Sequence, residues 1–146
     1  MGHIEASRDL TAAPEELWAI ISNPQTWDKW FTVHDKWLDE PPAELTPGAR
    51  LTAKIVMLNM ANKIEWTVKE VDAPTSLTLG GTGMAGVKAD FTFVIQAHAG
   101  GSRFTVSGDF EGALVKGALA KAVEKDGMRQ LDKTLAQLDQ LASAKV

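Results

Sequence analysis

Residues 4–31 read IEASRDLTAAPEELWAIISNPQTWDKWF, and the spacing of apolar residues changes within this stretch. Residues 4–10 alternate between apolar and polar, which indicates a strand because successive side chains of a strand point to opposite faces. Pro14 and the two glutamates after it favour a helix start, since proline lacks the amide that stays unpaired in a first turn and carboxylates oppose the helix dipole. Pro24 ends this helix and can open a second short helix that runs through Trp30.

Six more strands are predicted between residues 34 and 111, where apolar residues recur at every second position. The predicted strands are His34–Glu40, Leu51–Leu58, Lys63–Val71, Ser76–Leu79, Val87–Ala97 and Arg103–Glu111. The turns between them are short and rich in Gly, Pro and Asn, as in Asn59–Asn62 and Gly100-Gly101, so the strands are expected to pair as antiparallel hairpins. One apolar face per strand predicts a sheet that is covered on one side only.

The period changes again after residue 112, and Ala113–Ala142 predicts one long amphipathic helix without an internal proline. Its first half is rich in small residues, namely Ala113, Gly117, Ala118, Ala120, Ala122 and Gly127. Its second half carries larger apolar residues, Met128, Leu131, Leu135 and Leu138. We expect the second half to anchor the helix to the sheet and the first half to leave space above it.

The fold class predicted from this order is α+β, of the helix-grip type. A curved seven-stranded antiparallel sheet has two short helices after its first strand and a long C-terminal helix over its concave face. A chain of 146 residues is the size of one domain, so residues 1–146 are expected to form a single unit.

The same order resembles the START-like superfamily, also called Bet v 1-like or SRPBCC. The segment Ala13-Pro14-Glu15-Glu16-Leu17-Trp18, followed by Trp27-Asp28-Lys29-Trp30-Phe31, is similar to the opening of its polyketide cyclase/dehydrase and CoxG-like branch. The Trp27–Trp37 segment, the Asn62–Thr67 strand and the Gly86-Val87-Lys88 stretch are similar to an actinobacterial subgroup, some of whose members are labelled toxins of toxin–antitoxin pairs. Members of the wider family bind lipids, polyketides or steroids, and some catalyse cyclisation. No catalytic signature accompanies the resemblance.

Large aromatic residues on the predicted inner face are candidates for the wall of a ligand cavity. The predicted ligand-binding residues are Trp30, Phe31, Trp37, Met57, Trp66, Phe91, Phe93, Phe104, Gly117 and Ala118. Trp30, Phe31 and Trp37 are expected near its opening. The alternative for each residue is ordinary packed core, because protein interiors are normally close-packed.

Other motifs weigh against several kinds of site. Gly81–Gly86 matches G-x-G-x-x-G, but a strand pattern follows where a dinucleotide site needs a helix, so a flexible turn beside the cavity mouth is expected. The chain has no cysteine, and its three histidines have no partner at metal-ligand spacing, so no metal site and no cofactor are predicted. His34, between Trp30 and Trp37, is the one weak acid–base candidate, and its simplest interpretation is a solvated loop histidine.

Fifteen basic and nineteen acidic residues give a net charge of −4, which does not favour nucleic acid as a partner. No stretch approaches the length of a membrane span, and the N-terminus lacks a signal-peptide pattern, so stable membrane insertion is not expected and a cytoplasmic location is.

The function predicted from the sequence is binding or carriage of a small hydrophobic, lipid- or polyketide-like molecule between sheet and helix. One alternative is a polyketide cyclase or dehydratase. A second is a regulatory or toxin-like protein that acts through a protein partner. The identity of the ligand, the oligomeric state and the pathway have no signature in the sequence.

Overall fold

The computed structural model describes residues 2–32, 34–42, 45–57, 60–83, 87–98, 100–112 and 117–143, without the side chains of residues 2, 57, 60, 62, 117–120, 142 and 143. The elements follow in the expected order. They are β1 (Gly2–Leu10), α1 (Pro14–Ile21), the 3-10 turn η1 (Pro24–Thr26), α2 (Trp27–Trp30), β2 (His34–Trp37), β3 (Arg50–Met57), β4 (Met60–Asp72), β5 (Ser76–Thr82), β6 (Lys88–His98), β7 (Gly101–Glu111) and α3 (Gly117–Ser143).

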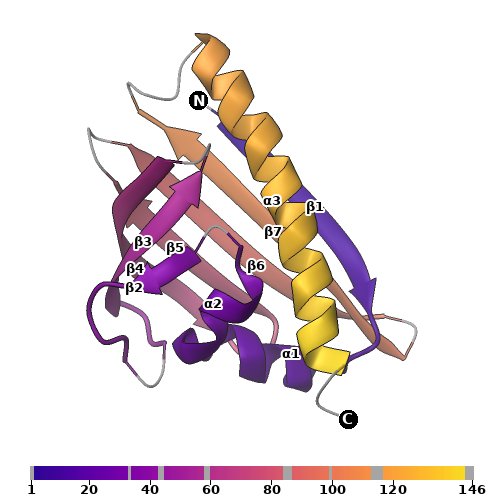
Figure 1. Cartoon of the computed structure of the whole chain (residues 1–146). Helices are drawn as coiled ribbons and strands as arrows, with labels where there is room; N and C mark the ends of the chain where they lie inside the picture. The colour runs from indigo at the N-terminus through magenta and orange to yellow at the C-terminus, as the bar shows by residue number, and fades with distance from the viewer. Residues whose placement is uncertain are drawn as a thin grey trace.

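The strands form one seven-stranded antiparallel sheet in the order β1-β7-β6-β5-β4-β3-β2, so β1 and β2 are its edges. The sheet curls, and α3 crosses its concave side diagonally while α1 and α2 close the lower end (Figure 1). α3 packs mainly on β1 and α2, and α1 packs on β6. This arrangement is the helix-grip fold that the sequence predicts.

The two short helices form where the sequence predicts them. Pro14 occupies the first turn of α1 together with Glu15, and the helix buries Leu17 and its neighbours against the sheet. The side chain of Asn23 then accepts a hydrogen bond from the Gln25 N–H at 3.1 Å, which starts the turn that leads into α2. This local geometry brings the tryptophans of α2 onto the concave face.

Polar side chains connect α2 to α3. The Thr32 N–H donates to Thr134 Oγ1 at 3.1 Å, and Thr32 Oγ1 donates to the Gln130 carbonyl oxygen at 2.9 Å. Thr134 is completely buried, so its hydroxyl is satisfied inside the protein. The middle of α3 is therefore fixed to the end of α2 as well as to the sheet.

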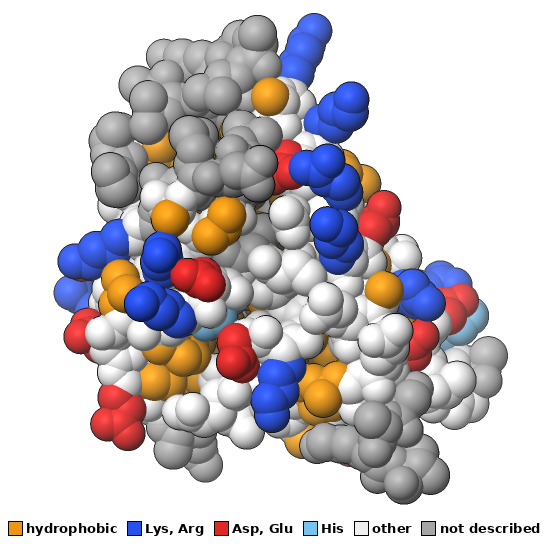
Figure 2. Space-filling view, in the orientation of Figure 1, with side chains coloured by type: hydrophobic (Ala, Val, Ile, Leu, Met, Phe, Trp, Pro, Cys, Tyr) orange, Lys and Arg blue, Asp and Glu red, His pale blue; other side chains and the backbone are white. Residues whose placement is uncertain are grey.

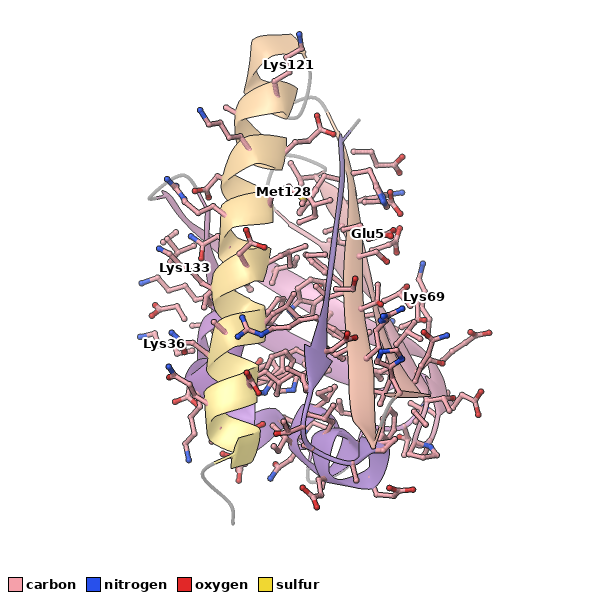
Figure 3. All side chains as sticks on the ribbon, turned by 90° about the vertical axis from the view of Figure 1, so that its right-hand side faces the viewer. Glu5, Lys36, Lys69, Lys121, Met128 and Lys133 are labelled. Carbon is pink, nitrogen blue, oxygen red and sulfur yellow. The ribbon has the colours of Figure 1, made fainter. Side chains whose placement is uncertain are left out.

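The same helix covers the free edge of β1. The His3 N–H donates to Glu124 Oε2 at 3.0 Å, and the Glu5 N–H donates to the Met128 sulfur at 3.4 Å. Figure 3 shows Met128 on the side of α3 that faces the strand carrying Glu5. Farther along, Arg8 forms an ion pair with Asp139 at 3.3 Å.

The expected division of α3 is confirmed in part. Leu131, Leu135 and Leu138 are buried against the sheet, as predicted. Met128 is 38% exposed and does not belong to that buried set, because it lies over the edge of β1 instead of over the concave face. Ala113 and the side chain of Ala120 lie outside the described residues.

Several strand boundaries differ from the prediction. β4 begins at Met60 and not at Lys63, because the residues predicted as hairpin tip already pair with β3. β5 continues through Thr82, so Gly80 and Gly81 are strand residues and not part of a flexible turn. The outer strand β2 ends at Trp37, three residues before the predicted end at Glu40.

Candidate functional site

An aromatic layer fills the space between the concave face of the sheet and the short helices. We define it as Trp27, Trp30, Phe31, Trp37, Trp66, Phe91, Phe93, Phe104 and Phe110. The rings come from α2 and its flanks and from β2, β4, β6 and β7, so only the folded chain brings them together. Most neighbouring rings meet edge to face, which is a favoured geometry of aromatic pairs.

Phe93 and Phe31 lie at the centre of the aromatic layer. Phe93 contacts Trp30 at 5.8 Å between ring centroids and is stacked on Phe104 at 6.1 Å. Phe31 contacts Phe93 at 5.8 Å and Phe91 at 5.6 Å. Phe91 in turn meets Trp66 at 5.7 Å. The layer is therefore continuous from α2 to β4.

Hydrogen bonds hold the three tryptophans that α2 and β2 contribute to the layer. The Trp27 indole N–H donates to the Ile21 carbonyl oxygen at 2.9 Å, and that of Trp30 donates to Thr26 Oγ1 at 3.1 Å. The Trp37 indole N–H donates to the Pro24 carbonyl oxygen at 2.8 Å. These three indole donors are used inside the protein and serve to position their rings.

Two strand glycines leave room for rings of the layer to lie close to the sheet. Gly81 is paired with Trp66 across β4 and β5, and a Cβ at Gly81 would lie 2.7 Å from the benzene-ring edge of that indole. Gly108 is paired with Phe91 across β6 and β7, and a Cβ there would lie 2.8 Å from the phenyl ring. Both distances are too short for a methyl group, so glycine at these positions sets the height of the rings above the sheet.

We therefore expect Gly81→Ala to lower the free energy of unfolding by about 2 kcal/mol, because the new methyl must push a packed ring out of place. Gly80→Ala is the matched control, since its methyl would meet only the flexible end of the exposed Lys69 side chain beside Asp90. Urea denaturation of both variants measures the difference. Equal losses at the two positions would contradict this account of Gly81.

Most buried polar side chains in the described part of the chain have partners. Ser102 Oγ donates to the Ala12 carbonyl oxygen at 2.7 Å, Thr134 bonds to Thr32, and Asp126 is paired with Arg129. Among the described residues, the buried side-chain atoms without a partner are both ring nitrogens of His34 and the indole nitrogen of Trp66. Each such group costs about 1–3 kcal/mol of stability. Both residues belong to or border the aromatic layer.

His34 is a buried residue at the start of β2, so its interpretation as a solvated loop histidine is wrong. Only 5% of it is exposed, and its ring lies 4.5 Å from that of Trp37 and 6.1 Å from that of Trp27. Burial lowers the pKa of His34 from 6.5 to about 4, against smaller opposing effects of Asp28 and Asp35. At neutral pH the imidazole is therefore uncharged and a weak base.

The structure brings seven of the ten predicted ligand-binding residues into one contiguous group. These are Trp30, Phe31, Trp37, Trp66, Phe91, Phe93 and Phe104. Trp30 and Phe31, expected near an opening, are at most 1% exposed and lie inside the core. Gly117 is the first residue of α3, and the side chains of Met57 and Ala118 lie outside the described residues.

Sequence reasoning missed Trp27 and Phe110 as members of the layer. Trp27 contacts Trp30, Phe31, Trp37 and Phe93, and it is completely buried. Its three- and four-residue spacing to Trp30 and Phe31 places the three rings on one helical face, and this signal could have found it. Phe110 ends the alternating pattern of β7 and meets Phe91 at 5.7 Å.

Other kinds of site are not indicated in the described part of the chain. The described residues contain no group of three or more His, Cys, Asp or Glu side chains that could hold a metal ion. No helix among them is both long and apolar enough to cross a membrane.

Comparisons with known proteins agree with this architecture. Residues 1–142 match the model of a protein family described as polyketide cyclase/dehydrase and lipid transport. Uncharacterized protein Rv1546 of Mycobacterium tuberculosis is 26% identical over 141 residues, which cover 97% of this chain and 99% of that protein. Toxin Rv0910 of the same species is 32% identical over 88 residues, 60% of this chain and 61% of that protein.

A similar structure has been solved for the protein TTHA0849 from Thermus thermophilus. It superposes with a TM-score of 0.78 at 15% sequence identity and covers 98% of each chain. At this identity the likeness concerns the fold.

Proposed function

Because the chain belongs to the polyketide cyclase/dehydrase and lipid transport family, we propose that it binds and carries a small, uncharged hydrophobic molecule against the aromatic layer under α3. The observation that carries this proposal is the chemistry of the concave face. Apart from Ser102, whose hydroxyl is bonded to a backbone carbonyl, the buried side chains described along β3 to β7 are aromatic or aliphatic. A surface of this kind recognises apolar ligands through their area and shape.

The charge of the buried residues supports an uncharged ligand. Within the described part of the chain no Lys or Arg side chain is buried, and His34 is neutral at pH 7. The buried carboxylate of Asp126 already has Arg129 as a partner. An ionised ligand would thus enter without a counter-ion, which is costly in an apolar interior.

The aromatic layer is closed to solvent in this structure. The rings of Trp30, Trp66 and Phe104 have no exposed surface, and those of Phe91 and Phe93 have at most 2%. On the face seen in Figure 2, apolar side chains reach the surface only in small separate groups, and basic side chains lie along the course of α3. We infer that ligand entry separates α3 or α2 from the sheet.

Native mass spectrometry of the purified protein, followed by extraction into organic solvent, tests the proposal. We expect one neutral apolar molecule per chain. For protein that purifies empty, hexadecanol should load at pH 8 whereas hexadecanoate, of equal length but ionised, should not. A clean unliganded mass together with no uptake of fatty alcohols, sterols or aromatic polyketides would refute the proposal.

A second candidate is catalysis on such a ligand, which the unpartnered imidazole of His34 favours. A polyketide cyclase or dehydratase needs a proton acceptor beside its substrate, and geometry decides such a role before basicity does. Loaded protein that returns its ligand chemically changed, with the change abolished by His34→Leu, would support this candidate. Extraction of an unchanged ligand supports carriage.

A third candidate is action through a protein partner, which the similarity to Toxin Rv0910 favours. The fold supplies no mechanism for it. A small reading frame of antitoxin type next to the gene, whose product co-purifies with this chain in equal amounts, would support this candidate.

A further inference from the structure

The indole N–H of Trp66 differs from the other indole donors of the aromatic layer. Those of Trp27, Trp30 and Trp37 each donate to an oxygen atom of the protein. Trp66 is completely buried, and its Nε1 has no hydrogen-bond partner. A buried donor without an acceptor destabilises the empty protein, so its position calls for a physical explanation.

The surroundings of Trp66 explain why no acceptor of the protein reaches it. The ring lies on the concave face of β4, with its six-membered part above Gly81 and its edge near Ile64 and Phe91. The N–H belongs to the five-membered part, at the other end of the indole. On β3 the residue paired with Trp66 is Leu51, which is also buried. These described neighbours are apolar.

A trapped water molecule is a poor substitute for an acceptor at this position. Buried waters are held by two to four polar partners. Trp66 belongs to the buried hydrophobic cluster, and no atom of the protein accepts a hydrogen bond from its N–H, so a water there would lack the polar partners that hold buried waters. The acceptor that fits is therefore an atom that arrives with a bound apolar molecule.

We propose that the Trp66 N–H is the specificity-determining donor of the ligand site, which selects a neutral hydrogen-bond acceptor, such as a ketone oxygen, on an otherwise apolar ring system. This inference rests on the proposed function, because it assigns a polar contact within the same site. A ketone accepts one hydrogen bond without carrying charge. A ketone can therefore accept the hydrogen bond of the Trp66 N–H, and it needs no buried cation, of which the described residues offer none.

The glycine beneath the ring gives this donor a fixed position. A Cβ at Gly81 would lie 2.7 Å from Cε3 and Cζ3 of Trp66, so the benzene-ring edge of the indole packs closely on the backbone of β5. Phe91 meets the ring at 76° and 5.7 Å, which limits rotation. A donor held in one orientation discriminates between ligands by the position of their acceptor, as well as by its presence.

The test compares 9-fluorenone with fluorene, two flat tricyclic molecules of nearly the same shape, of which only the first carries a ketone. Isothermal titration calorimetry measures both dissociation constants for the wild type, for Trp66→Phe and for Trp18→Phe. The Trp66 variant keeps a ring and loses the N–H. Trp18, on α1, is half-buried and lies outside the aromatic layer, so its variant controls for loss of an indole.

For each protein, the ketone preference is the dissociation constant of fluorene divided by that of 9-fluorenone. We expect this ratio to be about fivefold larger for the wild type and for Trp18→Phe than for Trp66→Phe. A factor of about five is the usual contribution of one neutral hydrogen bond. The affinity for fluorene should be similar in all three proteins. An unchanged ketone preference in Trp66→Phe would overturn the inference and leave the proposed function standing. Absence of binding by both probes would overturn the inference, and it would overturn the proposed function as well only if fatty alcohols, sterols and aromatic polyketides also failed to bind.

A second measurement covers the case in which Trp66→Phe does not fold. In a ¹H–¹⁵N spectrum of the wild type, the indole proton of Trp66 should move downfield on addition of 9-fluorenone and not on addition of fluorene. The signal of Trp66 is identified by elimination among the five indole signals. Those of Trp27, Trp30 and Trp37, already hydrogen-bonded, should stay in place, and that of Trp18 is the signal missing from the spectrum of Trp18→Phe. A Trp66 signal that responds equally to both probes contradicts the inference.

Discussion

Phe93→Ala is expected to lower the free energy of unfolding by about 4 kcal/mol, within the range for deletion of a packed aromatic side chain. Phe93 is 1% exposed and contacts Trp27, Trp30 and Phe31 from the helix side. It is also stacked on Phe104, so removal of its ring leaves a cavity bordered by groups on several elements. Neighbours that are held by their own hydrogen bonds, such as Trp30, cannot easily collapse into it.

Urea denaturation checks this value, with Phe93→Leu as a control that retains most of the volume and should cost about 1.5 kcal/mol. The outcome also bears on function. A loss under about 1 kcal/mol for Phe93→Ala would mean that the ring borders open space in solution, so that the ligand site exists before binding. The expected large loss means that the site opens only when a ligand enters.

Acidification should destabilise the protein by up to about 3 kcal/mol as the pH falls from 6.5 to 4, through His34 alone. Burial holds the pKa of folded His34 near 4, whereas the unfolded chain takes up a proton near 6.5. Between these values the unfolded state binds more protons, so the free energy of unfolding decreases as the pH decreases. Below pH 4 the folded state is protonated too and this effect levels off.

Chemical denaturation at pH 7, 5.5 and 4.5 measures this slope, and His34→Leu should remove most of it. The variant should also equal or exceed the wild type at pH 7, because it replaces two unpartnered nitrogens with apolar volume. His3 acts in the opposite direction: its pKa is raised by Asp109, so its stabilising effect is present at low pH and fades as the pH rises. The Arg103 side chain lowers the pKa of Asp9, so the ion pair stabilises the fold at neutral pH and this stabilisation is lost only in more acidic solution. Identical slopes in wild type and variant would contradict the assignment to His34.

The fold follows from local patterns that are independent of distant contacts. Alternation along Lys63–Val71 and Val87–Ala97 predicts which side chains face inward, and Ile64, Trp66, Phe91 and Phe93 are buried as expected. The proline-led start of α1 and the long uninterrupted helix also form as predicted. These features depend on residue spacing, which the sequence displays directly.

The errors arise where tertiary contacts decide. Glycine usually indicates a turn, but Gly81 pairs with Trp66 and Ala89 inside β5, and the ring of Trp66 occupies the space that a side chain at Gly81 would take. Met128 fits the apolar stripe of α3 by spacing, but the edge of β1 lies beneath it. His34 is polar and close to charged residues in the chain, and only the assembled pair Trp27 and Trp37 encloses it.

The candidate site could be predicted as a set of residue types but not as a geometry. Seven predicted residues do form one layer, because aromatic residues on the inner face of the curled sheet converge and α2 adds Trp30 and Phe31 from the other side. Packing across β4, β5 and β6 decides two features of the site. The layer is closed, and Trp66 is its one unsatisfied indole among the described residues. Such contacts leave no pattern along the chain.

α3 covers both the proposed ligand site and the free edge of β1, so a movement of α3 that exposes the site also exposes an edge through which two molecules can associate. The amides of His3 and Glu5 would otherwise be free to pair with a strand of another molecule, and α3 side chains occupy them. If α3 lifts to admit a ligand, the apolar interior and this strand edge become exposed in the same event. Two opened copies could then exchange their α3 helices or join edge to edge. Under the proposed function, ligand exchange would thus be the stage at which the protein is most prone to domain swapping, and a bound ligand would protect against it by keeping α3 in place.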